Sequence, residues 1–185
     1  MSTLYHEDFE SYANSAVVPA LTTLGGSGLL VRDSSFATPV QGTKAYGSAD
    51  ADSAYCNTVA AQADCVLRIS QRLVAGTNCI GHVLRANVAS ADFHYWFLHE
   101  YDGANLRGTT YMRAGRLITS ASSTYNVPAS VGDIIHTANR CVGTTLEFRV
   151  WVNSAAKPAS PTVTLTDSTF SSGRFGLRRF GTYGV

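Results

Sequence analysis

Apolar and polar residues alternate in short segments along most of this chain. In residues 145–152, for example, apolar side chains take every second position, while Glu147, Arg149 and Trp151 take positions between them. This two-residue period predicts β-strands with one buried face, and no segment shows the longer period of an amphipathic helix. The predicted strands are Leu4–Glu10, Gly28–Asp33, Lys44–Ser48, Ala54–Thr58, Asp64–Val74, Cys79–Asn87, Asp92–Tyr101, Asn105–Met112, Arg116–Ser120, Asp133–Cys141, Thr145–Val152, Thr162–Asp167 and Arg174–Phe180.

Glycine, asparagine, aspartate, serine and proline separate these segments and predict turns and loops. Hairpin turns are expected at Asp102-Gly103, Ala114-Gly115 and Val142-Gly143, and surface loops at Asn14–Gly28, Ser120–Gly132 and Ser154–Pro161. A domain with so many strands and no helix must pack two sheets or close a barrel. We therefore expect one all-β domain over residues 1–185, folded as a two-sheet antiparallel jelly-roll sandwich.

The segment from Asp92 to Gly103 concentrates aromatic and ionisable residues in a single strand. One phase holds Phe93, Tyr95, Phe97, His99 and Tyr101, and the other holds His94, Trp96, Leu98, Glu100 and Asp102. Successive side chains of a strand point to opposite faces. Two interpretations stay open: a strand that presents one face to a sugar, and a core strand that is covered on both faces.

Charge and composition exclude some functions. The chain has 185 residues with 14 basic and 13 acidic side chains, and no basic stripe of the kind that binds nucleic acid. Only Lys44 and Lys157 are lysines. Arginine, aromatic residues and a near-zero net charge favour subunit contacts, so we expect a homo-oligomer, most simply a trimer. The first residues lack a signal-peptide pattern and no apolar run reaches about 20 residues, so we expect cytosolic synthesis and no membrane insertion.

Four cysteines are dispersed along the chain without metal-binding spacing: Cys56, Cys65, Cys79 and Cys141. In a protein made in the cytosol, free buried thiols are the default. Cys65 and Cys79 lie in neighbouring predicted strands, where they can face each other.

The order of several short motifs along the chain carries a family resemblance. These motifs are His6–Tyr12, Lys44–Ser48, Phe93–Gly103 followed by Leu106 and Gly115–Leu117, Gly132–Ile134 with Gly143–Leu146, and Thr164–Asp167 with Ser172–Leu177. Together they resemble the concanavalin A-like lectin/glucanase superfamily in its laminin-G-like branch, although Ile134 replaces a common tryptophan. The resemblance implies two curved antiparallel sheets with the first and last strands adjacent, so Leu4–Glu10 should pair with Arg174–Phe180.

Catalytic residues are not expected. Retaining glycosidases of this superfamily resemble one another in a Glu-x-Asp-x-x-Glu strand, and the nearest match here places Asn105 after Glu100 and Asp102. An amide cannot protonate a leaving group, so the general acid is missing. A lyase would need histidine, tyrosine and arginine on one face. The neighbouring His94, His99, Tyr95, Tyr101 and Arg113 supply those residue types, but adjacent positions alternate between faces.

Two kinds of binding site remain as expectations. Trp96, Trp151, Tyr111 and His94 are candidates for stacking on and binding a glycan; packing in the core or against another subunit is the alternative. We expect no cofactor. Calcium is the alternative, with Asp50, Asp52, Asp133 and Asp167 as candidate oxygens, but no compact acidic loop supplies six to eight ligands. The same aspartates can instead form turns.

Three functions follow from these features, in order of preference. The first is a non-enzymatic bacteriophage virion protein, made in the host cytoplasm and exposed on the particle as a capsid decoration or tail appendage. Its partners would be its own copies, other virion proteins and glycans of the host surface. The second is a free-standing carbohydrate-binding lectin, and the third is a polysaccharide hydrolase or lyase. The fold alone does not choose among them.

Overall fold

The computed structural model of the chain describes most of its central and C-terminal parts. The backbone is described for residues 21–25, 29–33, 44–48, 52–57, 60–73, 79–87, 94–114, 117–120 and 125–180. Side chains are described for residues 60–73, 81–87, 95, 97, 101–108 and 125–177.

All regular elements in the described residues are β-strands. They are β1 (Leu21–Gly25), β2 (Leu29–Asp33), β3 (Lys44–Ser48), β4 (Asp52–Asn57), β5 (Cys65–Arg72), β6 (Cys79–Ala86), β7 (His94–Tyr101), β8 (Asn105–Ala114), β9 (Leu117–Ser120), β10 (Tyr125–Pro128), β11 (Ile134–Val142), β12 (Thr145–Val152), β13 (Val163–Thr166) and β14 (Arg174–Phe180). The described residues form no helix long and apolar enough to cross a membrane. Twelve of the strands match predicted ones, while β1 and β10 lie in segments that we expected to be loops.

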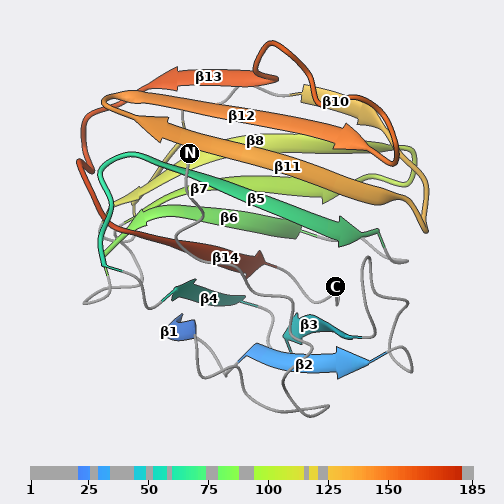
Figure 1. Cartoon of the computed structure of the whole chain (residues 1–185), viewed down its shortest axis with the longest axis horizontal. Coiled ribbons are helices and arrows are strands. Elements are labelled where there is room, and N and C mark those ends of the chain that lie inside the picture. Colours follow the sequence, from blue (N-terminus) through green and yellow to red (C-terminus); the bar gives the residue numbers. More distant parts are fainter. Residues whose placement is uncertain are drawn as a thin grey trace.

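The strands form a sandwich of two antiparallel sheets with a small additional sheet (Figure 1). The eight-stranded sheet has the order β1-β4-β14-β6-β7-β8-β10, and β9 pairs with β8. The four-stranded sheet has the order β13-β12-β11-β5 and lies over β6, β7 and β8. Strands β2 and β3 pair with each other. This arrangement confirms the all-β jelly-roll sandwich predicted from the alternation of apolar and polar residues.

Strand β14 lies between two strands that come much earlier in the chain. It pairs with β4 along one edge and with β6 along the other, both antiparallel. We expected Leu4–Glu10 to be its neighbour. That segment lies outside the described residues, and the expected pairing is wrong for Gly176–Phe180, because β4 and β6 take both edges of that stretch.

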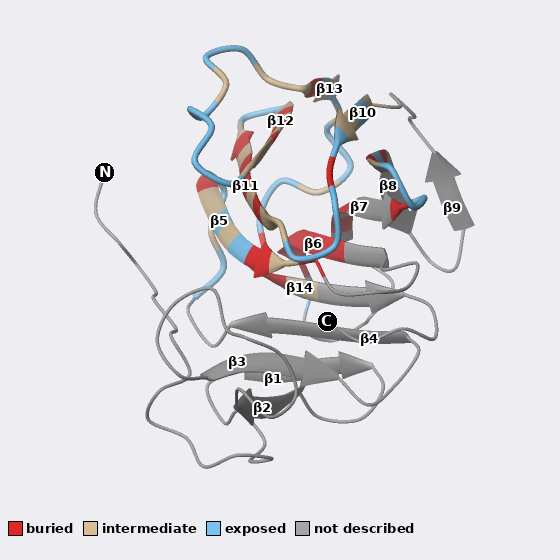
Figure 2. Cartoon of the chain, turned by 90° about the vertical axis from the view of Figure 1, so that its right-hand side faces the viewer, coloured by how far each residue is buried: buried red, intermediate tan, exposed pale blue. Residues whose placement is uncertain are grey.

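The core lies between the two sheets, where the buried positions of facing strands meet (Figure 2). Phe148 of β12 is at its centre: its ring stacks on Phe97 of β7 at 5.1 Å and lies 5.3 Å from the ring of Tyr125 on β10. Tyr125 crosses directly over Gly108, where a β-carbon would collide with the tyrosine ring. The predicted loop 120–132 therefore contributes a strand and a core aromatic residue.

The aromatic strand β7 has one face in this core. Tyr95, Phe97 and Tyr101 are all buried, which agrees with the core interpretation for that phase. The residues of the other phase from His94 to Glu100 lie outside the residues with described side chains. Burial of one phase is sufficient to fix the register of the strand, because a shift by one residue would exchange the two faces.

Two cysteines meet inside the sandwich. Cys65 of β5 and Cys141 of β11 are directly opposite each other in the strand register, and both are free and buried. Hydrogen bonding between the thiols and burial both raise the pKa of Cys141, while the same hydrogen bond lowers the pKa of Cys65. Cys79 belongs to β6 of the other sheet, and the residue opposite Cys65 in the strand register is Cys141.

A polar contact also joins the two sheets within the core. Asn139 of β11 and His82 of β6 are fully buried, and the Asn139 amide lies 2.8 Å from Nδ1 of His82. Gln71 of β5 is buried as well. Within the described residues, the side-chain oxygens of Gln71 and Asn139 have no hydrogen-bond partner. An acceptor that is buried without a partner costs free energy on folding.

Candidate functional site

The outer face of the four-stranded sheet is formed by the residues that alternate with core positions. On β12, Leu146, Phe148 and Val150 point into the core, so Glu147, Arg149 and Trp151 point away from it. The same reasoning places Ser70 and Arg68 of β5 on this face. The strand pairing then arranges these side chains in rows that run across the sheet.

One row contains Trp151, which the sequence indicated as a candidate for glycan binding. His136 is opposite Trp151 on one side and opposite Ser70 on the other. The indole and imidazole rings are stacked, with centroids 5.5 Å apart and planes inclined by 19°. Ser70 Oγ lies 2.8 Å from His136 Nδ1. Neither aromatic ring is buried, and Ser70 is exposed. We call Ser70, His136 and Trp151 the Trp151 row; it presents a flat aromatic surface bordered by polar groups.

The next row along the sheet is Arg68, Ala138 and Arg149, which we call the Arg68 row. Arg149 is held in place: its Nη1 lies 3.1 Å from Glu147 Oε2, and its Nη2 donates to the carbonyl of Ala159 at 3.3 Å. Arg68 is exposed and makes no hydrogen bond or ion pair with another described residue. The row therefore combines one positioned guanidinium and one that is open to solvent.

A third row adds a carboxylate. Glu147 accepts one hydrogen bond from Arg149, and its Oε2 lies 3.3 Å from Arg140 Nη1. The hydrogen bond from Arg149, followed by that from Arg140, lowers the pKa of Glu147 below its usual value. The two arginines therefore favour the ionised form of Glu147, which neutralises part of the positive charge at this end of the face.

The other predicted glycan-binding residues belong to the opposite sheet. The register of β7 and β8 places Trp96 opposite Tyr111, and His94 opposite Arg113. The side chains of these residues lie outside the described part of the chain. Trp151 is in the four-stranded sheet and Trp96 in the eight-stranded sheet, so the predicted aromatic residues form two separate groups.

The candidate calcium ligands Asp133 and Asp167 act as hydrogen-bond acceptors in turns. Asp133 accepts from the backbone N–H of Ser130 and from the amide of Asn153, each at 2.8 Å. Asp167 accepts from the backbone N–H of Thr169 at 2.7 Å and from the hydroxyl of Tyr95. The side chains of Asp50 and Asp52 lie outside the described residues. Among the described residues, no three histidine, cysteine, aspartate or glutamate side chains are close enough together to hold a metal ion.

Asp102 forms the turn between β7 and β8 and does not continue the strand. Its Oδ1 accepts from the backbone N–H groups of Ala104 and Asn105 at 3.0 and 2.7 Å, and Gly103 has a φ of 101°. These two hydrogen bonds lower the pKa of Asp102. Its other oxygen pairs with Arg107 at 2.6 Å. The chain reverses direction between Glu100 and Asn105, so these residues do not share one strand as in the Glu-x-Asp-x-x-Glu arrangement of glycosidases, and Asn105 cannot act as an acid. The Asp-Gly sequence predicted this turn.

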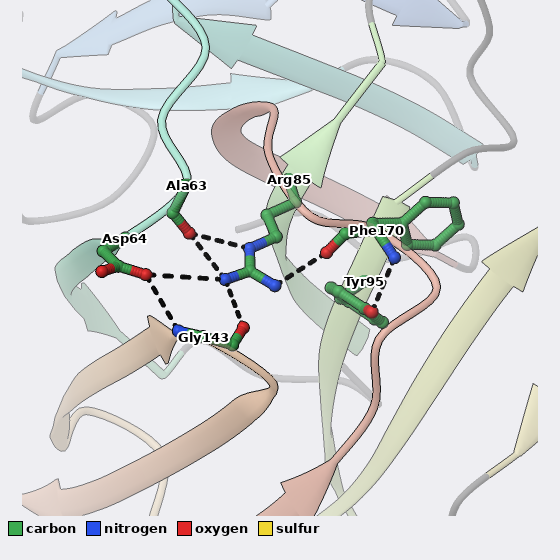
Figure 3. Close-up of polar contacts among 6 residues, drawn as sticks. All are labelled: Ala63, Asp64, Arg85, Tyr95, Gly143 and Phe170. Atoms are coloured by element: carbon green, nitrogen blue, oxygen red, sulfur yellow. Dashed lines mark hydrogen bonds and ion pairs between the residues drawn. The ribbon is translucent and has the colours of Figure 1, made fainter.

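A buried arginine that the sequence analysis did not identify lies at one end of the sandwich (Figure 3). Arg85 of β6 is 2 % exposed. Its guanidinium donates to three backbone carbonyls: Ala63 at 2.9 and 2.6 Å, Phe170 at 2.7 Å and Gly143 at 2.7 Å. Asp64 lies 3.8 Å away and accepts from the backbone N–H of Gly143. We call this arrangement the arginine clamp; it ties together three connections from both sheets.

Backbone geometry directs Arg85 toward these carbonyls. Its φ is 54°, in the left-handed region, and the register with β14 is irregular at this point. Such a bulge turns a side chain away from its regular direction. Gly173 packs against the same backbone, where a β-carbon would collide with the carbonyl group of Arg85. The guanidinium is enclosed and its charge is compensated within the protein, so the arginine clamp is structural and is not a ligand site.

Tyr95 extends this structural region. Its hydroxyl donates to Asp167 and accepts from the backbone N–H of Phe170 at 2.9 Å, and its ring lies against that of Phe170. Burial, followed by the hydrogen bond to Asp167, raises the pKa of Tyr95 to about 12. Burial raises the pKa of Asp167 too, but the hydrogen bonds from Tyr95 and Thr169 outweigh this and leave it below the usual value.

Comparison with known proteins adds information on the fold. No protein-family model matches the sequence, and no curated protein matches it. Among solved structures, the chain is similar to carbohydrate-binding module CBM66 from Bacillus subtilis, with a TM-score of 0.63, 17 % identity, and coverage of 90 % of this chain and 91 % of that chain. At this identity the likeness concerns the fold. It agrees with the broad concanavalin A-like sandwich expected from the motifs, while the laminin-G-like branch stays a prediction.

Proposed function

We propose that this chain is a non-catalytic glycan-binding β-sandwich, and that the Trp151 row is its binding surface. The stacked, accessible pair of Trp151 and His136 carries the proposal. The similarity in fold to a module whose name states carbohydrate binding supports it. This favours the glycan-binding part of the expectations from sequence over the enzymatic one.

The physical basis is the match between a flat ring and a pyranose. An indole covers the apolar C–H face of a sugar, while the polar groups at its border bind the equatorial hydroxyls. Ser70 and the imidazole of His136 supply those polar groups. All three residues are on paired strands, so the surface is formed before the ligand arrives and loses little conformational freedom on binding.

Absence of catalysis is part of the proposal. Asp102 is engaged in a turn and Asn105 cannot act as an acid, so the best candidate for a carboxylate pair does not support glycosidase chemistry. We expect no new reducing ends and no unsaturated products from laminarin, agarose, carrageenan, alginate or xylan. Turnover abolished by Glu100→Gln would contradict this.

The biological setting that we propose is the surface of a bacteriophage particle, where this chain would associate with its own copies and with other virion proteins. The near-zero net charge and the preference for arginine over lysine support assembly contacts. Light scattering on the purified protein tests the oligomer, expected to be a trimer. Mass spectrometry of particles from the source tests the location. A monomer absent from particles would leave a free lectin as the setting.

The site is tested by comparing two tryptophan variants. Trp151→Ala should weaken binding to the best glycan found on an array by about tenfold or more. Trp96→Ala, on the opposite sheet, should change affinity less than about twofold by the same measure. Affinity gel electrophoresis supplies the dissociation constants, and circular dichroism with urea unfolding confirms that each variant folds. Loss of binding in Trp96→Ala with full binding in Trp151→Ala would move the site to β7 and β8.

A further inference from the structure

Positive charge is concentrated on the outer face of the four-stranded sheet. Its strands place Arg68, Arg72, Arg140 and Arg149 on this face, with Glu147 as the acidic residue among them. The whole chain carries a formal charge of only +1. The basic character is therefore local, and it adjoins the aromatic surface of the Trp151 row.

The four arginines differ in how many of their charges and N–H groups are already paired with other groups of the protein. Arg140 and Arg149 share Glu147, and Arg72 donates to the carbonyl of Gly132 at 2.8 Å. Arg68 is the one of the four that is exposed and has no hydrogen bond or ion pair with another described residue. A guanidinium in this state can form a bidentate pair with an incoming carboxylate or sulfate.

Distances within a β-sheet relate this guanidinium to the aromatic surface. Residues two apart on one strand are separated by about 7 Å, and adjacent strands by about 4.8 Å. The Arg68 row therefore lies about 7 Å from the Trp151 row, and Arg68 itself, two strands from Trp151, has its Cα about 12 Å from that of Trp151. Ala138, only 4 % exposed, lies between Arg68 and Arg149 and has no long side chain that could separate them. An acidic group one sugar length away from a ring stacked on Trp151 would lie over Ala138.

We propose that the ligand of this face is an acidic polysaccharide, whose sugar ring stacks on Trp151 while its carboxylate or sulfate pairs with Arg68 beside Arg149. This inference rests on the proposed glycan-binding function and adds the class of glycan. Arg149, which is held in place by Glu147 and Ala159, attracts the anion electrostatically and limits where it can bind. Arg68 supplies the new ion pair.

A nucleic acid fits this surface less well. A nucleic-acid strand presents a phosphate at every nucleotide and needs a series of uncompensated cations along its path. Here Glu147 is shared by two of the arginines, neutralises one of their two positive charges and would repel such a backbone. An acidic polysaccharide carries its charges on the sugar rings, one for each stacked unit, and requires one open arginine on the same face as one aromatic ring, as Arg68 and Trp151 are here.

The test uses affinity gel electrophoresis of the full chain with four polymers: polygalacturonate, the same polymer after reduction of its carboxyl groups, dextran sulfate and oligo(dT). Variants Arg68→Gln and Arg107→Gln each remove one exposed positive charge. Arg107 belongs to β8 of the opposite sheet and serves as the matched control. Trp151→Ala is measured in parallel, and urea unfolding verifies that every variant is folded.

We expect wild-type protein to bind polygalacturonate or dextran sulfate at least about tenfold more tightly than the carboxyl-reduced polymer, with affinity falling as salt rises. Arg68→Gln should abolish this preference, and Arg107→Gln should change it less than about twofold. The acidic polymer that binds more tightly identifies the preferred anion as carboxylate or sulfate.

If the carboxyl-reduced polymer binds as tightly as the acidic polymers, and this binding depends on Trp151, the acidic ligand is overturned and the proposed function is kept. Binding of oligo(dT) as tight as that of the acidic polymers would overturn the inference, and no glycan binding at all would overturn the proposed function.

Discussion

Arg85 and Arg68 show two opposite uses of the same side chain. The guanidinium of Arg85 is enclosed at one end of the sandwich, where three backbone carbonyls and Asp64 compensate it. Arg68 stands on the outer face of the four-stranded sheet with solvent around it. A buried arginine with complete hydrogen bonding stabilises the fold, while an exposed one without partners is available to a ligand. The difference lies in the surroundings, because both residues occur in alternating strands.

Replacing the buried arginine tests this contrast most strongly. Arg85→Met keeps much of the volume but leaves the carbonyls of Ala63, Gly143 and Phe170 without their shared donor. We expect a loss of about 3–5 kcal/mol in the free energy of unfolding, measured with urea. Arg68→Met is the control and should stay within about 0.5 kcal/mol of wild type. Equal effects of the two variants would contradict the contrast.

Gly173 tests the close packing behind the arginine clamp. A β-carbon at this position would collide with the backbone of Arg85, which cannot move without breaking its hydrogen bonds. Gly173→Ala should therefore lower the free energy of unfolding by about 2–3 kcal/mol. The exposed neighbour Ser172 provides the control, and Ser172→Ala should have almost no effect. If the two variants unfold at the same urea concentration, the backbones are not packed as closely as described.

Because of Tyr95, the free energy of unfolding should depend on pH in alkaline solution. Its pKa is about 12 in the folded chain against 10.0 for an unperturbed tyrosine. The folded state thus binds this proton more tightly, so the stabilisation is complete below pH 10 and is lost as pH rises through 12. Tyr95→Phe should lose about 1–2 kcal/mol at pH 7. Its stability should also fall less between pH 10 and 12 than that of wild type. Unfolding curves across this range, with absorbance titration of tyrosinate, supply the measurement, and an unchanged pH dependence would refute it.

The smallest effect on stability is expected on the outer face. Ser70→Ala removes the hydrogen bond to His136 on an exposed surface, which should change the free energy of unfolding by no more than about 0.5 kcal/mol. Affinity for the glycan should nevertheless fall severalfold, because the imidazole next to Trp151 is no longer oriented. Unfolding and affinity electrophoresis on the same preparation separate the two quantities. A large loss of stability would place Ser70 with the structural residues.

Local alternation was sufficient to predict most of the strands, and it placed Trp151 in the phase opposite to Phe148 and Val150, although packing of Trp151 was left open as an alternative. It missed β1 and β10, which lie within the segments Asn14–Gly28 and Ser120–Gly132, where many small residues, glycine and proline predicted loops. His136 could have been found from the alternation of Asp133–Cys141, since it occupies the phase opposite to Ile135 and Cys141. The arginine clamp could not: an arginine inside the apolar strand Cys79–Asn87 is a signal, but its partners are 22, 58 and 85 residues away along the chain. Contacts at such separations depend on topology, which local patterns do not encode.

The position of β14 has a consequence for how the protein folds during synthesis. Until this strand is available, β4 and β6 each have an unpaired edge, and the eight-stranded sheet consists of two disconnected parts. Joining them requires residues up to Phe180 to have left the ribosome, so the sheet closes late and over large sequence separations, which slows folding. Nascent chains held on the ribosome before β14 emerges should be sensitive to protease and prone to aggregate through their open edges. Emergence of β14 then allows the two parts to join.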